Sequence, residues 1–84
     1  MIYEIRFTKE AKKDVTQLSP KLKQKLKKII QEQIILNPYG GKKLVGDLTG
    51  FFSLRLNYKD RILYTIDDQQ KLIYIHRVKT HYGE

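Results

Sequence analysis

The sequence contains no cysteine and no long apolar segment. The missing cysteines exclude disulfides and thiolate metal sites, so we expect a protein of the reducing cytoplasm. Apolar runs are short, such as Ile34–Leu36, whereas a membrane-spanning helix needs about 20 residues. No stretch resembles a signal peptide. With 84 residues, the chain is expected to form one small domain over residues 1–84.

Several signatures of catalysis and ligand binding are also missing. The sequence shows neither a Ser–His–acid pattern nor a cysteine nucleophile. The two histidines, His76 and His81, have no carboxylate cluster beside them, so we predict no metal site. Lys42 and Lys43 follow two glycines, but the G-x-x-x-x-G-K-[ST] pattern of a nucleotide-binding loop is absent. Any chemistry on phosphate is therefore expected to proceed without a metal or another cofactor.

Positive charge is plentiful, because 17 Lys and Arg face 9 Asp and Glu for a net charge of +8. Such an excess predicts a polyanionic partner, and nucleic acid is the leading candidate. An anionic membrane surface, an acidic protein and a merely basic soluble protein are the alternatives. The guanidinium fork suits phosphate better than an ammonium does, and three of the four arginines lie in the second half: Arg55, Arg61 and Arg77.

The hydrophobic pattern predicts a strand, two helices and three further strands. Apolar residues alternate in residues 2–7, 51–58, 61–66 and 72–78, which is the period of strands. Between the first two of these segments, helical spacing begins after Thr8 and again after Ser19–Pro20, both of which are typical helix starts. Asn37–Pro38 ends the second helix, and a glycine-rich loop follows.

We therefore predict an α+β fold with β-α-α-β-β-β order, in which a helical hairpin packs on one face of a small, largely antiparallel four-stranded sheet. The strand at 51–58 is expected to run opposite to the strand at 2–7. Arg55 and Arg61 alternate with apolar residues, so both are predicted on the open face. There they either pair with Asp60 and Asp67 or converge on one anion.

Other polar residues have both an ordinary and a functional interpretation. The lysines of the second helix form a solvated face or an RNA-binding patch. His76 fits a partly buried, hydrogen-bonded histidine. His81 and Tyr82 follow the last strand beside several cations. Histidine exchanges protons near neutral pH, and tyrosine stacks on bases or positions a phosphate.

The element order and three segments, "LTGFFSLRL", "DRILYTIDD" and "IHRVKTHYGE", resemble the RelE/ParE superfamily of bacterial toxins, in particular its RelE and YoeB branches. The resemblance implies the toxin of a type II toxin–antitoxin module. Such a toxin is a metal-independent endoribonuclease that cleaves mRNA, typically in the ribosomal decoding site, and thereby inhibits translation. The RNA 2′-hydroxyl attacks the adjacent phosphorus. A cognate antitoxin, acidic where it contacts this basic surface, is the implied protein partner.

The same resemblance assigns roles to site residues. His81 matches the general acid, Arg61 and Arg55 the phosphate stabilisers, and Tyr82 a positioning or stacking group. Further RNA contacts are expected from four basic residues: Lys42, Lys43, Arg77 and Lys79. Lys42 stands where YoeB-type toxins carry a glutamate base, so the base is not identified. The lysines of this loop resemble the basic loop of RelE. The segment "THYGE" resembles the YafQ branch, in which a threonine–histidine pair lies near the end of the chain.

Two other functions fit the same pattern. A ParE-like toxin would inhibit DNA gyrase by binding, without nuclease chemistry. The His81–Tyr82 pair argues against it, because a pure inhibitor needs no proton donor there. The remaining possibility is an inactive RNA-binding module.

Overall fold

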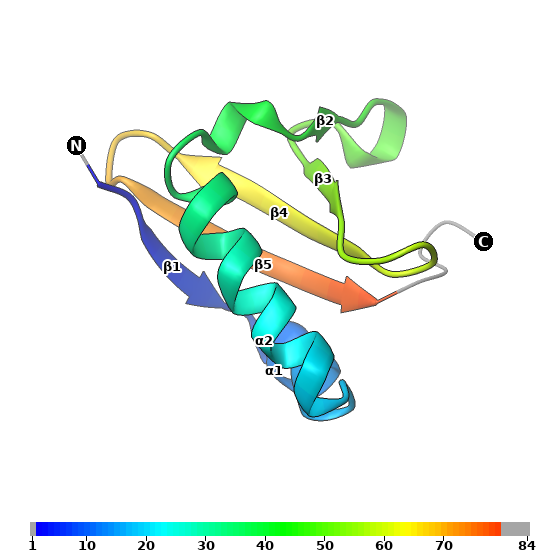
Figure 1. The fold of residues 1–84 in the computed structure, drawn as a ribbon. Helices are drawn as coiled ribbons and strands as arrows, with labels where there is room; N and C mark the ends of the chain where they lie inside the picture. The colour runs from blue at the N-terminus through cyan, green and yellow to red at the C-terminus, as the bar shows by residue number, and fades with distance from the viewer. Residues whose placement is uncertain (1, 80–84) are drawn as a thin grey trace.

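The computed structural model describes residues 2–79, which form an α+β fold with two main helices and one sheet (Figure 1). The chain order is β1 (Glu4–Phe7), α1 (Lys9–Thr16), α2 (Pro20–Ile29) with a π-helical extension (Ile30–Ile34), β2 (Lys42–Lys43), β3 (Phe52–Arg55), β4 (Arg61–Asp67) and β5 (Leu72–Lys79). Short 3₁₀ turns cover Pro38–Gly40 and Gly46–Leu48. Within residues 2–79, no helix has the length and apolar character needed to cross a membrane.

Both helices begin at the predicted capping residues. The hydroxyl of Thr8 accepts a hydrogen bond from the backbone N–H of Ala11, and that of Ser19 accepts one from Leu22. Pro20 occupies the first turn of α2, where its missing N–H costs nothing. Local sequence therefore fixes where each helix starts.

The sheet has five strands in the order β1-β5-β4-β3-β2, and all its pairs except β1–β5 are antiparallel. The expected four strands are joined by a short fifth, because Lys42 and Lys43 pair with Ser53 and Phe52. The predicted direction of the strand at 51–58 is wrong. Since β1 lies parallel to β5, and β4 separates β5 from β3, β3 runs in the same direction as β1.

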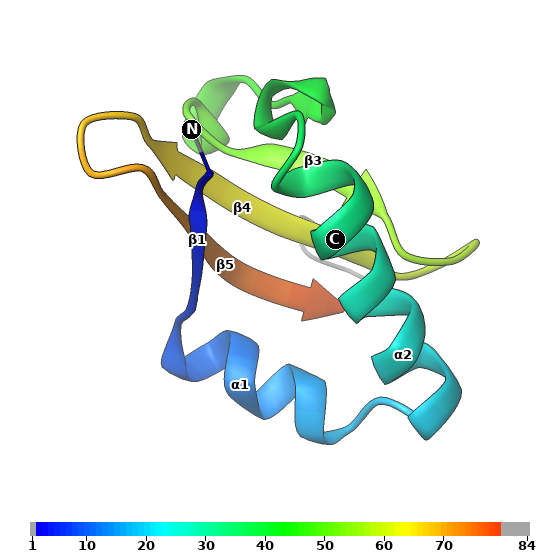
Figure 2. The ribbon, with the colours of Figure 1, turned by 60° about the vertical axis from the view of Figure 1, so that its left-hand side comes forward.

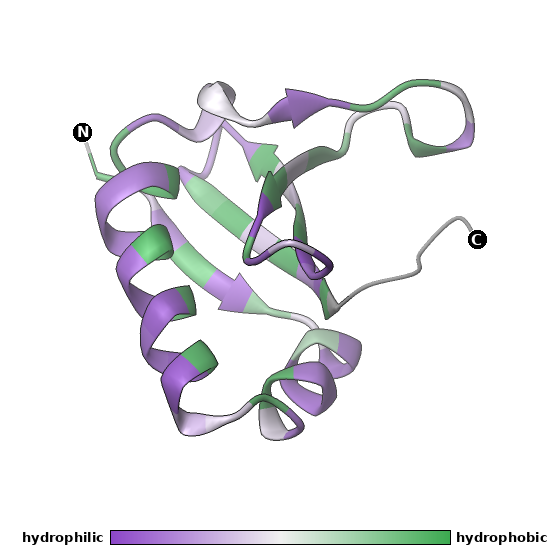
Figure 3. Ribbon diagram, turned by 45° about the vertical axis from the view of Figure 1, so that its right-hand side comes forward, coloured by the Kyte–Doolittle hydropathy of each residue, from purple (hydrophilic) through white to green (hydrophobic). Residues whose placement is uncertain are grey.

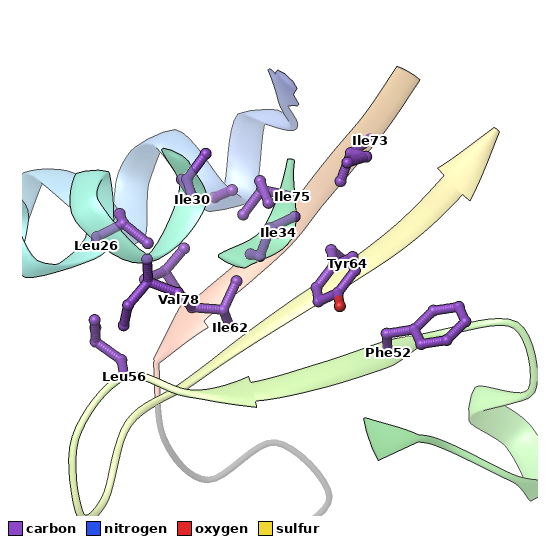
Figure 4. Packing of buried hydrophobic residues seen from close by; sticks show 12 residues of the cluster. Leu26, Ile30, Ile34, Phe52, Leu56, Ile62, Tyr64, Ile73, Ile75 and Val78 are labelled. Atoms are coloured by element: carbon purple, nitrogen blue, oxygen red, sulfur yellow. The ribbon is translucent and has the colours of Figure 1, made fainter. Parts of the chain in front are cut away.

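The core lies between the helices and one face of the sheet. Hydrophobic positions of α2 gather on the side facing the strands (Figure 3). They meet Leu56, which follows β3, and buried residues of the central strands, among them Ile62, Tyr64, Ile73 and Val78 (Figure 4). Burying these side chains, each worth about 1.5–3 kcal/mol, is the main force holding the helices to the sheet. Within residues 2–79, no helix packs on the opposite face of the sheet.

A β-bulge interrupts β5 beside β4. Leu63 pairs with Arg77 and Tyr64 pairs with Ile75, so His76 is an extra residue without its own partner on β4. Ile75 and Val78 consequently both enter the core although three positions separate them. A bulge bends the strand and changes which face its following residues occupy.

Where β1 ends, Thr8 and helix α1 cover the remaining edge of β5. Thr8 bonds the carbonyls of Ile75 and His76 through its N–H and hydroxyl. Beyond it, α1 continues past the end of β1 (Figure 2), and Asp14 accepts the N–H of Val78 at 3.0 Å. Helix α1 thus satisfies an edge that would otherwise offer free backbone groups to another strand.

Candidate functional site

Arg55 and Arg61 lie directly opposite each other on β3 and β4, on the face away from the helices. Arg55 is exposed and Arg61 is half-buried. Directly opposed residues of antiparallel strands have Cβ atoms about 4.5–5.5 Å apart, and like charges there repel. In the described part of the chain, Asp60 bonds Asn57 and Asp67 bonds Gln70, so neither takes the predicted role of arginine partner. Two arginines held together in this way favour an anion between them.

Ser53 supports Arg61 from beneath. Its hydroxyl is 3.4 Å from Nη1 of Arg61, and the residue is only 2% exposed. Ser53 also pairs across the ladder with Lys42, so Lys42 shares the open face, whereas Lys43 pairs with Phe52 in the next row. Both lysines are exposed. The structure therefore brings Lys42, and not Lys43, to the face that carries the arginines.

The segment before Lys42 is fixed by Tyr64. This buried side chain donates a hydrogen bond to the carbonyl of Pro38 at 2.7 Å. Burial raises the pKa of Tyr64, and a backbone hydrogen bond at Gly41 partly opposes that rise. A Cβ at Gly41 would collide with the Tyr64 hydroxyl, so glycine is required next to Lys42. This hydrogen bond was not predicted from the sequence, because strand alternation shows which residues share a face and not which distant segments they contact.

A second cluster, also unforeseen, joins three parts of the chain at Asp68. Tyr3, immediately before β1, and Tyr39 of the 3₁₀ turn both donate to its carboxylate, and Lys71 lies 3.7 Å away. These hydrogen bonds lower the pKa of Asp68 and raise that of Tyr39 to about 12. The cluster holds the Pro38–Gly40 turn against the β4–β5 connection and so limits movement of the segment leading to Lys42.

Arg77 has a partner within the fold. Its Nε and Nη2 atoms donate to Asp14 at 2.8 Å and 3.2 Å, and the Asp14 side chain is 7% exposed. The hydrogen bond to Asp14 raises the pKa of Arg77. Arg77 thus fastens β5 to α1, and its contact with RNA stays a prediction.

His76 is the half-buried, hydrogen-bonded residue that the sequence suggested. Its Nε2 lies 2.9 Å from the Thr65 hydroxyl, and its ring centroid is 4.9 Å from that of Phe51. Burial lowers the pKa of His76, and the charge of Glu10 partly opposes this. Across residues 2–79, no three side chains of the metal-binding types come together.

The predicted acid and stacking residue, His81 and Tyr82, lie outside the described residues. The backbone of Lys79, the last described residue, pairs with Arg61. The ladder therefore aligns Arg55, Arg61 and Lys79 in one row across three strands. The roles of His81, Tyr82 and Lys79 stay predictions.

A family model described as the ParE-like toxin of type II bacterial toxin–antitoxin systems matches residues 5–83. The chain belongs to this toxin family. Comparison with curated protein sequences gave no match.

Solved structures place the toxin among RelE and YoeB folds. It is 32% identical to a chain of the RelBE2 toxin–antitoxin complex of Mycobacterium tuberculosis, over 96% of this chain and 100% of that one, with a TM-score of 0.85. It is 34% identical to a chain of the Staphylococcus aureus YoeB–YefM complex, over 95% and 98%, with a TM-score of 0.70. The intact Escherichia coli RelBE complex, at 18% identity, 95% and 98% coverage and a TM-score of 0.81, shares the fold. These matches do not favour the gyrase-inhibitor alternative.

Proposed function

We propose that this toxin is an endoribonuclease that cleaves mRNA on the ribosome in the cytoplasm and thereby stops translation. The observation that carries the proposal is the opposed pair Arg55 and Arg61 on the open sheet face. The transition state of phosphodiester cleavage gathers negative charge on the phosphoryl oxygens, and a preorganised pair of guanidinium groups stabilises that charge more than it stabilises the ground state.

The reaction we propose needs no metal. The 2′-oxygen of the RNA forms a bond to the adjacent phosphorus, and the bond from phosphorus to the 5′-oxygen breaks. The products are a 2′,3′-cyclic phosphate and a 5′-hydroxyl end. A base takes the proton of the 2′-hydroxyl, and an acid returns one to the departing oxygen.

In this scheme, His81 is the acid and Tyr82 positions the substrate. Arg61 and Arg55 hold the phosphate, while Arg77, Lys42, Lys43 and Lys79 contribute to RNA binding. Lys42 shares the face of the arginines through its pairing with Ser53. Lys42→Ala removes the positive charge, whereas Lys42→Arg keeps it but cannot act as a base. Cleavage that is lost only in Lys42→Ala indicates charge stabilisation, and cleavage that is lost in both variants indicates a base.

We further propose an antitoxin partner with an acidic, apolar-faced segment. A groove of about 500 Å³ runs between β1 and α2 on the helix side of the sheet, lined by apolar residues that include Ile5, Phe7 and Ile30. Lys23 and Lys27 form part of the same lining. Apolar walls beside lysines suit a segment that combines apolar and acidic side chains. The Mycobacterium tuberculosis and Staphylococcus aureus chains that resemble this toxin come from toxin–antitoxin complexes.

The deciding experiment maps cleavage of ribosome-bound mRNA by the wild-type toxin and by His81→Ala and Arg61→Ala. Wild type should produce discrete cuts, and each variant should cut at least about a hundredfold more slowly. Arg6→Ala is the matched control, because Arg6 is an exposed arginine of edge strand β1 that pairs with Glu4. Equal cleavage by wild type and His81→Ala would remove His81 from the mechanism. Uncut mRNA with wild type would refute the proposed function.

A further inference from the structure

Three aromatic rings gather on the open face of the sheet beside the arginine row. The ring of His76 lies 4.9 Å from Phe51 and 6.5 Å from Tyr74, measured between centroids. Thr65 is the ladder partner of Tyr74 and bonds His76, so it belongs to the same face. We refer to Phe51, Tyr74 and His76 as the aromatic cluster.

The aromatic cluster is not part of the hydrophobic core. The core residues of β4 and β5, such as Tyr64, Ile73 and Ile75, project to the helix side. All three members of the cluster are partly exposed residues, on a sheet face that no helix of residues 2–79 covers. An open face of an antiparallel sheet usually carries polar side chains. Partly exposed rings there indicate a binding surface.

The distance from the cluster to the arginines suits a nucleic acid. Arg61 and Thr65 occupy the same face of β4 four positions apart, a separation of about 13 Å along a strand. Phe51 lies immediately before β3, on the other side of Ser53 from Arg55. Cations that follow the backbone beside rings that stack on bases are the combination by which proteins hold single-stranded nucleic acid.

We propose that the aromatic cluster is a stacking site for an RNA base near the phosphodiester that Arg55 and Arg61 hold. The inference rests on the proposed function for the identity of its ligand, and it adds a contact to the base itself. Stacking on Tyr74 and Phe51 fixes the register of the strand, so it selects which phosphodiester reaches the arginines.

The cluster is ordered before RNA arrives. The Thr65 hydroxyl holds the imidazole of His76, and Phe51 meets that ring at 62° in an edge-on arrangement. Because burial lowers the pKa of His76, the ring is neutral at pH 7 and presents an aromatic surface without a charge. A preformed site loses little side-chain freedom on binding, which favours affinity.

The test uses RNA in which 2-aminopurine, whose fluorescence is quenched by stacking, replaces one base at a time. A 2′-deoxy nucleotide at the cut position prevents cleavage. Each RNA is titrated with the antitoxin-free toxin, both alone and in programmed ribosomes, over a series of salt concentrations. Wild type should quench the probe at one position near the cut. Tyr74→Leu and Phe51→Leu should abolish that quenching and weaken binding at least about fivefold, while the slope of affinity against salt is kept.

Two controls separate stacking from charge and from folding. Arg61→Ala should reduce the salt slope and keep the quenching. Phe7→Leu replaces a half-buried phenylalanine of β1 on the helix side of the sheet and should change neither. Circular dichroism and thermal unfolding identify any variant that fails to fold, and Tyr74→Phe, which retains the ring, should restore the quenching.

The outcomes are distinguishable. Quenching at no position, or quenching that persists in both leucine variants, overturns the inference. Leucine variants that bind RNA normally but fail to bind the antitoxin would show that the cluster receives protein, which also overturns it. If wild type quenches the probe but cuts no ribosome-bound mRNA, the stacking site stands and the proposed nuclease function falls.

Discussion

Arg77 of β5 and Asp14 of α1 are joined by two hydrogen bonds of 2.8 Å and 3.2 Å although 63 positions separate them in the chain. Asp14 also accepts the N–H of Val78, immediately after the β-bulge. One carboxylate of α1 therefore binds both the backbone at the edge of β5 and the Arg77 side chain. This contact determines where the C-terminal end of β5 lies relative to α1. It thereby also positions the backbone of Lys79, which pairs with Arg61.

Replacing Asp14 by asparagine should destabilise the fold markedly. The amide keeps the size of the side chain but loses the charge that Arg77 faces, at a cost of about 1–3 kcal/mol in the free energy of unfolding. We keep the figure below that of a fully buried pair because the Arg77 side chain is 38% exposed. Urea unfolding measures it. Glu4→Gln, which breaks the exposed pair with Arg6, should cost less than about 1 kcal/mol; equal losses would contradict the structural role of Asp14.

Lysine at Arg61 or Arg55 should separate charge from shape. An ammonium keeps the attraction to RNA but cannot form two parallel hydrogen bonds with phosphate. We expect RNA affinity within about threefold of wild type and single-turnover cleavage slower by about tenfold or more. Arg6→Lys serves as the control. Wild-type cleavage by both lysine variants would show that positive charge alone is sufficient.

The pKa of His76 should lie below 6.5 in the folded toxin, because burial disfavours the imidazolium despite the charge of Glu10. As pH falls past 6.5, the unfolded chain takes up its proton first. The free energy of unfolding should therefore decrease through the window between 6.5 and the lower folded value. NMR titration of the ring measures the pKa directly. In His76→Gln, stability should change less over that window, and an unchanged slope would assign the effect to other groups.

Reversing charge beside the apolar groove should weaken antitoxin binding. Lys23→Glu with Lys27→Glu places two negative charges where we expect an acidic segment, and the dissociation constant should rise about tenfold or more. Lys21→Glu with Lys25→Glu makes the same change in net charge at the same spacing on α2, away from the groove lining. If both pairs weaken the complex equally, net charge and not the groove decides affinity.

Local patterns in the sequence predicted the elements well and their arrangement less well. The caps at Thr8 and Ser19, the alternation in β4 and the outward position of Arg55 and Arg61 depend on neighbouring residues, and the structure agrees with them. The parallel pairing of β1 with β5 joins segments almost 70 residues apart (Glu4 with Leu72), and no local pattern encodes it. That non-local pairing reversed the predicted relation between the first two strands.

At the site, the alternation of apolar and polar residues predicted the face on which Arg55 and Arg61 lie, but not the groups that position the surrounding segments. The hydrogen bond of Tyr64 to Pro38, the tyrosines around Asp68 and the pairing of Arg77 with Asp14 all join distant segments. The β-bulge could have been predicted from the apolar residues of the last strand, because the spacing changes from two positions between Ile73 and Ile75 to three between Ile75 and Val78.

The extra residue at His76 determines which face of the sheet each later residue of β5 occupies. Successive residues of a strand face opposite sides, so one insertion exchanges the two sides for everything downstream. With the bulge, Val78 enters the core and Lys79 falls in the row of Arg61. A strictly alternating strand that kept all its residues would instead turn Arg77 toward the core and Val78 away from it. Deleting His76 alone should remove the bulge and leave Arg77 opposite Leu63 and Val78 opposite Ile62, so the one extra residue decides which side chains the core receives.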